Sequence, residues 1–213
     1  MQVKKKILCY FQQAGGANAL LPLLEQLKQS YNITITARDV ICENLKGRNI
    51  AAYSLSELIQ EKSLSGFFKE LSPSLLLTDT IRLKRIPEPE HCISLWNLAK
   101  KNNVPSIAYI DVWGDYLERF SGDASKKTEA MPDKIALVDS IMKEKMLSLG
   151  FQEDKLVICG NPHFSKLIAM RDTYVFLGFL LLFAAINIGL MISGMLQADW
   201  TGLGIITAAG MTL

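Results

Sequence analysis

Short apolar runs alternate with segments of helical periodicity along most of the chain. Residues 7–11 form one such run, and leucines then recur at helical spacing from Leu20 to Leu27. Similar short runs predict strands at residues 33–37, 74–78, 105–110, 134–138 and 156–159. Strands separated by helices at these intervals favour right-handed βαβ crossovers. The pattern therefore predicts an α/β fold, a Rossmann-like αβα sandwich built on a parallel sheet.

The distribution of charge divides the chain into two parts. All 23 Lys and Arg residues and 20 of the 21 acidic residues lie within the first 172 positions. Beyond Asp172 only Asp199 is charged. We therefore predict a soluble domain at residues 1–170 and a hydrophobic membrane segment at residues 171–213.

The hydrophobic segment is long enough to cross a bilayer. Residues 173–198 are uncharged, and residues 174–196 are rich in Leu, Phe, Ile and Met. A helix over 174–196 would be about 34 Å long, which exceeds a hydrocarbon core of about 30 Å. A buried helix of a soluble protein is the alternative, but it would need a large protein around it. We predict a C-terminal transmembrane helix at about 174–196, with a partial second span at 202–213.

Basic residues lie on one side of this predicted span. Lys155, Lys166 and Arg171 precede it, whereas only Asp199 follows closely. The positive-inside rule then predicts that the α/β domain lies on the cytoplasmic side of the cytoplasmic membrane. No basic cluster favours a nucleic-acid partner.

The cysteines are far apart in the sequence, which favours free thiols in a reducing cytoplasm. A metal site would need Cys or His residues at close, regular spacing, so we expect neither a metal nor another cofactor. The four cysteines are Cys9, Cys42, Cys92 and Cys159.

A glycine pair after the first predicted strand is the strongest candidate for a binding site. Gly15 and Gly16, followed by Ala17 and Asn18, stand between the strand and a helix. Glycines allow a ligand to approach the backbone, and the N–H groups at the start of a helix favour anionic or hydroxyl-rich groups. The full G-x-G-x-x-G spacing is absent, so dinucleotide binding is not supported. A tight turn between strand and helix explains the glycines equally well.

Two further strand ends carry polar residues where parallel sheets bind ligands. Asp79 follows one strand, between Thr78 and Thr80, and Asp111 follows another. Either aspartate could bind sugar hydroxyls, act as a base, or cap the next helix. Two residues after Asp111, Trp113 shares a helical spacing with Tyr116 and Phe120, which favours packing over stacking on a ligand.

Several segments, taken in order, resemble the amino-terminal domain of GT-B proteins. The resemblance is to bacterial proteins related to UDP-N-acetylglucosamine 2-epimerase and to polysaccharide glycosyltransferases. It covers roughly residues 7–168. The segments that resemble this family are 15–18, 76–80, 103–113, 119–120, 131–139 and 160–164.

The resemblance implies a domain that forms one wall of a cleft. In that family two Rossmann-like domains face each other, the first mostly receiving the acceptor and the second holding most contacts to the nucleotide sugar. By this resemblance Asp79 and Asp111 are candidate catalytic residues, and residues 161–162 lie near the hinge, with His163 beside them. The predicted substrate-binding residues are Gly15, Gly16, Ala17, Asn18, Thr78, Asp79, Thr80, Asp111, Trp113, Asn161, Pro162 and His163.

The predicted membrane segment stands where the second domain would begin. Without a donor-binding half, nothing would hold a nucleotide sugar in position, so we do not expect independent catalysis. The sequence predicts a membrane-anchored, acceptor-side half of a glycosyltransferase or epimerase-like protein of polysaccharide biosynthesis. Its expected partners are the membrane, a sugar acceptor and a nucleotide-sugar-binding domain in trans. Two alternatives stay open: a non-catalytic subunit that anchors a separate glycosyltransferase half, and an inactive truncated or fused product.

Overall fold

The computed structural model describes residues 4–82, 91–120, 131–168, 170–171 and 181–186. The chain divides into two units, Met1–Ser165 and Lys166–Leu213. The first unit contains the sheet and its helices, and it is described by itself here.

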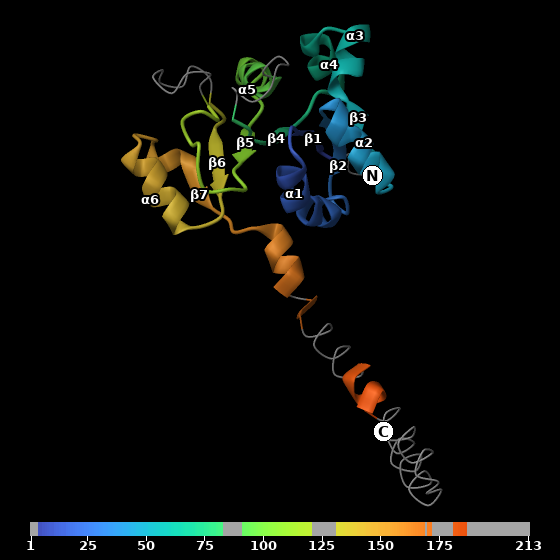
Figure 1. The fold of residues 1–213 in the computed structure, drawn as a ribbon. Coiled ribbons are helices and arrows are strands. Elements are labelled where there is room, and N and C mark those ends of the chain that lie inside the picture. The colour runs from blue at the N-terminus through green and yellow to red at the C-terminus, as the bar shows by residue number, and fades with distance from the viewer. Residues whose placement is uncertain (1–3, 83–90, 121–130, 169, 172–180, 187–213) are drawn as a thin grey trace, which may run out of the picture. The chain divides into compact units, whose positions relative to one another are not determined.

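Within the described residues, the first unit holds a seven-stranded parallel sheet in the order β3-β2-β1-β4-β5-β6-β7 (Figure 1). The strands are β1 Lys6–Phe11, β2 Asn32–Ala37, β3 Tyr53–Ser54, β4 Leu75–Asp79, β5 Ser106–Tyr109, β6 Lys134–Leu137 and β7 Leu156–Ile158. The helices are α1 Ala14–Leu27, α2 Asp39–Gly47, α3 Leu55–Glu61, α4 Leu64–Leu71, α5 His91–Lys101, α6 Ser140–Ser148 and the 3-10 helix η2 Glu153–Lys155. The predicted α/β fold with a parallel sheet is confirmed.

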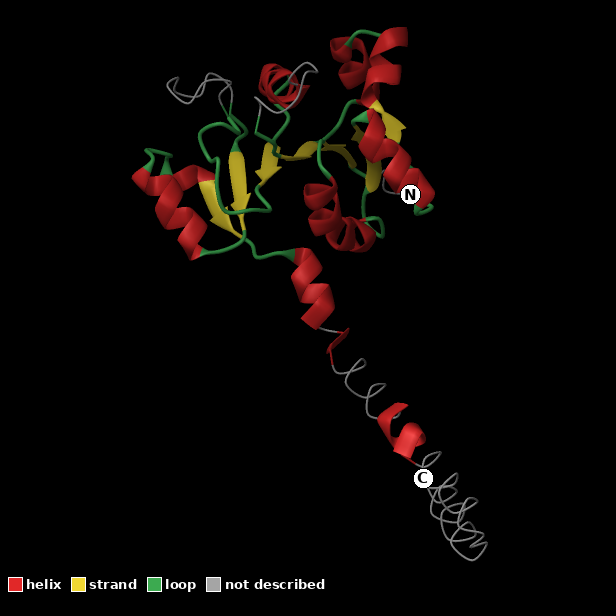
Figure 2. Ribbon diagram, in the orientation of Figure 1, coloured by secondary structure: helices red, strands yellow, loops and turns green. Residues whose placement is uncertain are grey.

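The central strands are buried on both faces, as their continuous apolar runs predicted. In β1, Leu8 and Tyr10 belong to one hydrophobic cluster, whereas Ile7 and Cys9 belong to the other. Successive side chains of a strand point to opposite faces, so β1 supplies both layers of the core. Figure 2 shows the helices on both sides of the strands. Apolar residues of α1 and α2 pack in one cluster and those of α3, α4, α5 and α6 in the other.

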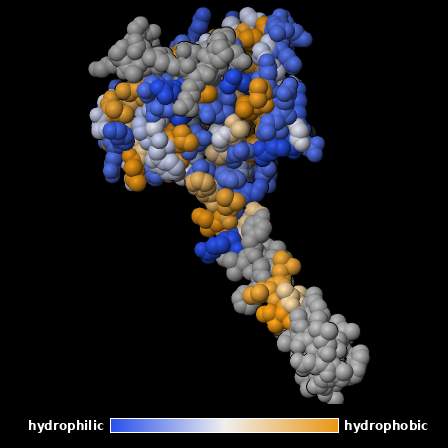
Figure 3. Space-filling view, in the orientation of Figure 1, coloured by the Kyte–Doolittle hydropathy of each residue, from blue (hydrophilic) through white to orange (hydrophobic). Residues whose placement is uncertain are grey.

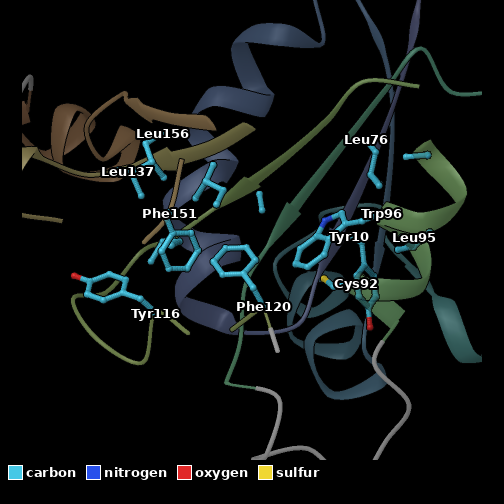
Figure 4. Close-up of a cluster of buried hydrophobic side chains, with 14 of the residues drawn as sticks. Tyr10, Leu76, Cys92, Leu95, Trp96, Tyr116, Phe120, Leu137, Phe151 and Leu156 are labelled. Atoms are coloured by element: carbon cyan, nitrogen blue, oxygen red, sulfur yellow. The ribbon is translucent and has the colours of Figure 1, made fainter. Parts of the chain in front are cut away.

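A row of aromatic rings, which begins at Trp96 of α5, lies in one of the two hydrophobic clusters (Figure 4). The rings of Trp96 and Phe120 are stacked with centroids 5.6 Å apart, and Phe151 meets Phe120 edge-on at 5.6 Å. The indole N–H of Trp96 donates to Thr78 Oγ1 over 3.1 Å, which satisfies the one polar atom of this buried ring. Phe120 is held by its contacts with Trp96 and Phe151. The neighbouring residue Arg119 is therefore held close to Thr80, just beyond the end of β4.

The helical spacing of Trp113, Tyr116 and Phe120 did not predict their structure. These residues lie in bends and turns rather than in a helix. Tyr116 and Phe120 are buried, whereas Trp113 is 51% exposed. The prediction that Trp113 packs with the other two is therefore wrong, because regular spacing in a loop does not place side chains on one face.

The predicted transmembrane helix falls mainly outside the described residues. Of the range 174–196, the structure describes only 181–186, which is helical, and the predicted partial span at 202–213 lies outside the described residues. In the described part of the chain, no helix is both long and apolar enough to span a bilayer. The segment 181–186 is coloured hydrophobic in Figure 3, and its exposed apolar side chains are Leu181, Leu182, Phe183 and Ile186.

Candidate functional site

The topology of the sheet fixes where a ligand site is expected. From β1 the chain builds β2 and β3 on one side, and it then returns to place β4 on the other side of β1. In open α/β sheets, ligands bind beyond the carboxyl ends of the strands at such a switch point. The residues that follow β1 are Gln12 and Gln13, β4 ends at Asp79, and Asp111 lies just beyond β5.

The glycine pair lies within the first turn of α1 and not in a turn before it. All four residues from Gly15 to Asn18 are helical. A Cβ atom on Gly16 would lie 2.4 Å from Cβ of Asp79, and one on Gly15 would lie 2.4 Å from Oδ2 of Asp111. The close backbone approach that we predicted is therefore an approach to these two carboxyl groups. Side chains from β4 and the end of β5 converge on the start of α1.

Asp79 is buried and binds the chain immediately before α1. Its Oδ1 accepts from the backbone N–H of Gln12 and its Oδ2 from that of Gln13, both over 2.9 Å. Burial raises the pKa of Asp79 to about 7, although the two backbone N–H groups oppose this shift. The next described helix, α5, begins at His91. Asp79 thus fixes the start of α1 rather than capping the helix that follows it in sequence.

Asp111 is the more accessible of the two carboxyl groups. Its side chain faces Gly15, and the residue is partly exposed, whereas Asp79 is fully buried. Partial burial raises the pKa of Asp111, and its own backbone N–H and the nearby Arg119 oppose this change. A ligand at this edge of the sheet can therefore reach Asp111 but not Asp79.

Arg119 is a buried cation that joins the strand ends, and sequence reasoning gave it no role. It is only 4% exposed, and its Nη1 donates to Thr80 O over 2.9 Å and to Thr80 Oγ1 over 3.2 Å. Its Nε donates to Gly114 O over 3.1 Å. Desolvation lowers the pKa of Arg119, while Asp111, Asp115 and Asp79 raise it. The pair Arg119-Phe120 was noticed only as part of the family resemblance, since nothing nearby in sequence marks it as buried.

Other predicted binding residues have structural contacts instead. Thr78 accepts the Trp96 N–H beneath the sheet edge, and Ala17 is packed in the core. Asn18 is exposed, and its Oδ1 accepts from Nη1 of Arg48 over 2.5 Å.

The predicted hinge residues follow β7, which is separated from β4 by β5 and β6. Asn161 Oδ1 accepts from the backbone N–H of His163 over 3.0 Å, where a helical segment begins at Pro162. The hydroxyl of Tyr109 donates to Gly160 O over 3.2 Å. Among the described residues, no hydrogen bond joins residues 161–163 to Asp79 or Asp111. Among the described residues, no group of acidic, His and Cys side chains could hold a metal ion.

The fold, and not the sequence, connects this chain to known proteins. No family model and no curated protein matches it. The structure is similar to UDP-GlcNAc 2-epimerase from Neisseria meningitidis bound to UDP-GlcNAc, with a TM-score of 0.54 and 16% identity over 79% of this chain and 50% of that chain. For UDP-N-acetylglucosamine 2-epimerase from Rickettsia bellii, the TM-score is 0.52 and the identity 9%, over 81% of this chain and 49% of that one. The chain has a GT-B / 2-epimerase-like fold.

The family resemblance is thereby confirmed at the level of the fold. The calicheamicin glycosyltransferase also matches, with a TM-score of 0.43 and 9% identity over 75% of this chain and 53% of that chain. This GT-B / 2-epimerase-like chain spans about half the length of the solved structures it matches.

Gly16→Ala should destabilise the first unit by about 1–3 kcal/mol or more, because the new methyl group would overlap the Cβ of a buried side chain. Gly47→Ala is the matched control, since a Cβ there would meet nothing within 4 Å. It should leave stability unchanged or raise it by up to about 1 kcal/mol. Urea unfolding followed by tryptophan fluorescence measures both. Equal midpoints for the two variants would contradict the contact between Gly16 and Asp79.

Asp79→Asn should change how stability depends on pH. A carboxyl group whose pKa rises to about 7 on folding stabilises the native state at low pH, and this contribution is lost as the pH rises through about 7. The variant cannot ionise, so its unfolding free energy should fall less steeply between about pH 4 and pH 7. At about pH 4 it should be less stable than the wild type by about 1–3 kcal/mol, because an amide offers one oxygen to two N–H donors, and this difference should shrink as the pH rises toward 7.

Unfolding free energies measured at several pH values test this expectation. Asp154→Asn, at an exposed residue of η2, is the control for removing a carboxylate. A slope for Asp79→Asn that matches the wild-type slope would show that Asp79 does not titrate in this range.

Proposed function

We propose that this chain is a membrane-anchored, acceptor-side half of a nucleotide-sugar-dependent glycosyltransferase or epimerase-like protein of polysaccharide biosynthesis. One observation supports this most directly: Asp79 and Asp111 converge on the first turn of α1 at the switch point of the sheet. Two similar structures are UDP-N-acetylglucosamine 2-epimerases, and the match covers about half of each. The donor-binding half would then be supplied in trans.

The two carboxyl groups have different roles in this proposal. Asp111 is partly exposed, and burial raises its pKa above the usual value for a carboxyl group. It therefore suits a general base that accepts a proton from a hydroxyl of the acceptor. Asp79 is buried and bound to two backbone N–H groups, so it is a positioning residue. It holds the start of α1, and with it Gly15, against the Asp111 carboxylate.

The proposed membrane anchor rests on the second unit. Residues 173–198 are uncharged, and the apolar side chains described at Leu181, Leu182, Phe183 and Ile186 are exposed. Lys166 and Arg171 precede this segment, which supports a cytoplasmic position for the α/β domain. An anchor of this kind would keep the domain close to acceptors that are themselves bound to the membrane.

A non-catalytic subunit that recruits a separate glycosyltransferase half is the second candidate. It is favoured by Val157 and Ile158, which are apolar and exposed on the edge strand β7. Because successive side chains of a strand point to opposite faces, a partner would cover both only by wrapping around this edge of the sheet. In that case Asp111 would be dispensable, and only the docking surface would matter.

Reconstituted sugar transfer distinguishes the two candidates. Membranes that contain the full chain together with a donor-binding domain encoded beside it are supplied with radiolabelled UDP-N-acetylglucosamine. Under the enzyme proposal, label enters a membrane-bound acceptor, and Asp111→Asn lowers the rate by about 100-fold or more, as expected for loss of a general base. Asp154→Asn should leave the rate unchanged. A full rate with Asp111→Asn would favour the anchoring subunit, and the absence of transfer with every candidate partner would reject the enzyme proposal.

Membrane attachment has a separate test. The full chain should stay with the membrane pellet after extraction in alkaline carbonate. Replacing both Leu182 and Ile186 by Lys should release it, because each charge in a span costs about 2.5–3.5 kcal/mol of insertion free energy. Val40→Lys combined with Ile141→Lys is the matched control, since both are exposed apolar residues of the first unit. Release of the unmodified chain by carbonate would reject the anchor.

A further inference from the structure

The loop that follows β5 displays an exposed indole ring. Trp113 is 51% exposed, and its neighbour Val112 is exposed as well. Large aromatic side chains of soluble proteins are on average well buried, so an indole with half its surface in solvent needs an explanation. The other described tryptophan, Trp96, is 1% exposed and belongs to the core.

This indole is held in place and is not a loose surface side chain. Its Nε1–H donates to Oδ2 of Asp139 over 2.9 Å. The other oxygen of Asp139 accepts from the backbone N–H of Met142 over 2.8 Å, at the start of α6. Trp113 is therefore fixed to a carboxylate that is itself fixed to a helix.

The backbone of the same loop is also constrained. Gly114 and Asp115 both have positive φ, 139° and 51°, and a left-handed conformation costs a residue other than glycine about 1–2 kcal/mol. Gly114 O accepts from Nε of the buried Arg119, Asp115 O accepts from the Arg119 N–H over 3.1 Å, and Asp115 pairs with Arg82 at 3.7 Å. These contacts hold the loop in one conformation, so a ligand that binds the indole loses little free energy to ordering it.

Charge around the indole selects the class of ligand. Asp111 precedes Trp113 by two residues and Asp115 follows it by two, and Asp139, just beyond β6, accepts the indole N–H. Of the cations in the described part of the chain, Arg119 binds Thr80 and Gly114, and Arg82 pairs with Asp115. A diphosphate would be repelled by this surface, whereas a neutral molecule with many hydroxyl groups would find acceptors for them.

We propose that Trp113 is a stacking platform for a neutral pyranose ring of the sugar acceptor, with Asp111 accepting a hydrogen bond from one of its hydroxyl groups. This inference rests on the proposed function and names the class of molecule that its acceptor side binds. One face of a pyranose presents C–H groups that pack on an aromatic ring, while the hydroxyl groups at its rim reach the carboxylates.

The test measures the binding of methyl N-acetyl-β-glucosaminide to the full-length protein in detergent micelles. Saturation-transfer difference NMR detects this binding. The ring C–H protons of the probe should receive the strongest saturation. Trp113→Ala should weaken binding roughly fivefold or more, the scale measured for bases stacked on aromatic side chains. Trp113→Phe keeps an aromatic face but loses the bond to Asp139, so its loss should be smaller. Tyr53→Ala is the matched control, because Tyr53 is 55% exposed on β3 and should have no effect.

The outcomes separate this inference from the proposed function. Three results would each overturn the platform. They are unchanged binding with Trp113→Ala, absence of binding by the wild-type protein, and binding of UDP at this loop in place of the neutral sugar. If sugar transfer is reconstituted and Trp113→Ala leaves its rate and apparent acceptor affinity unchanged, the platform fails and the proposed function stands. If Trp113 binds the probe but no partner restores transfer, the platform stands and the proposed function fails. Matching urea midpoints for all variants show that any loss of binding is local.

Discussion

The bond between Asp79 and the chain before α1 is the contact on which the candidate site depends. The buried carboxyl group of Asp79 accepts hydrogen bonds from the backbone N–H groups of Gln12 and Gln13. Gly16, in the first turn of α1, lies against the Asp79 Cβ. Desolvation makes this arrangement costly for the charged carboxylate, which is why the pKa of Asp79 rises to about 7. The contact ties β4 to the start of α1. It thereby sets the position of Gly15 relative to Asp111, the carboxyl group that a ligand can reach.

Much of the sheet could be predicted from the sequence, because buried parallel strands are short apolar runs. The runs at Ile7 and Leu76 became β1 and β4. The two-residue strand β3 was not predicted, since Tyr53 and Ser54 are too few for a hydrophobic pattern. The glycines were expected in a turn. They are helical because Asp79, which lies 63 residues after Gly16, accepts hydrogen bonds from the backbone N–H groups just before α1. A longer turn would otherwise be needed to provide acceptors for these groups.

The site was predictable in its parts but not in its connections. Both aspartates were found, because polar residues directly after an apolar run mark the carboxyl edge of a parallel sheet. The burial of Arg119 could not be inferred from the sequence. Its partner Thr80 follows β4 and its partner Gly114 lies in the loop after β5, and only the fold brings these two segments together. The spacing of Trp113 favoured packing, although the family resemblance placed it among the substrate-binding residues. Its exposure follows from backbone conformations at Gly114 and Asp115 that no periodicity reveals.

Both edges of the described sheet are short, and this limits how the protein can associate with others. The edge strand β3 has two residues and β7 has three. An edge of this length offers few unpaired backbone groups, so a neighbouring chain gains little by adding a strand to it, and edge-to-edge aggregation is disfavoured. Any partner that covers Val157 and Ile158 must therefore bind them mainly through side chains. Such binding would depend on shape and would be far more selective than strand addition.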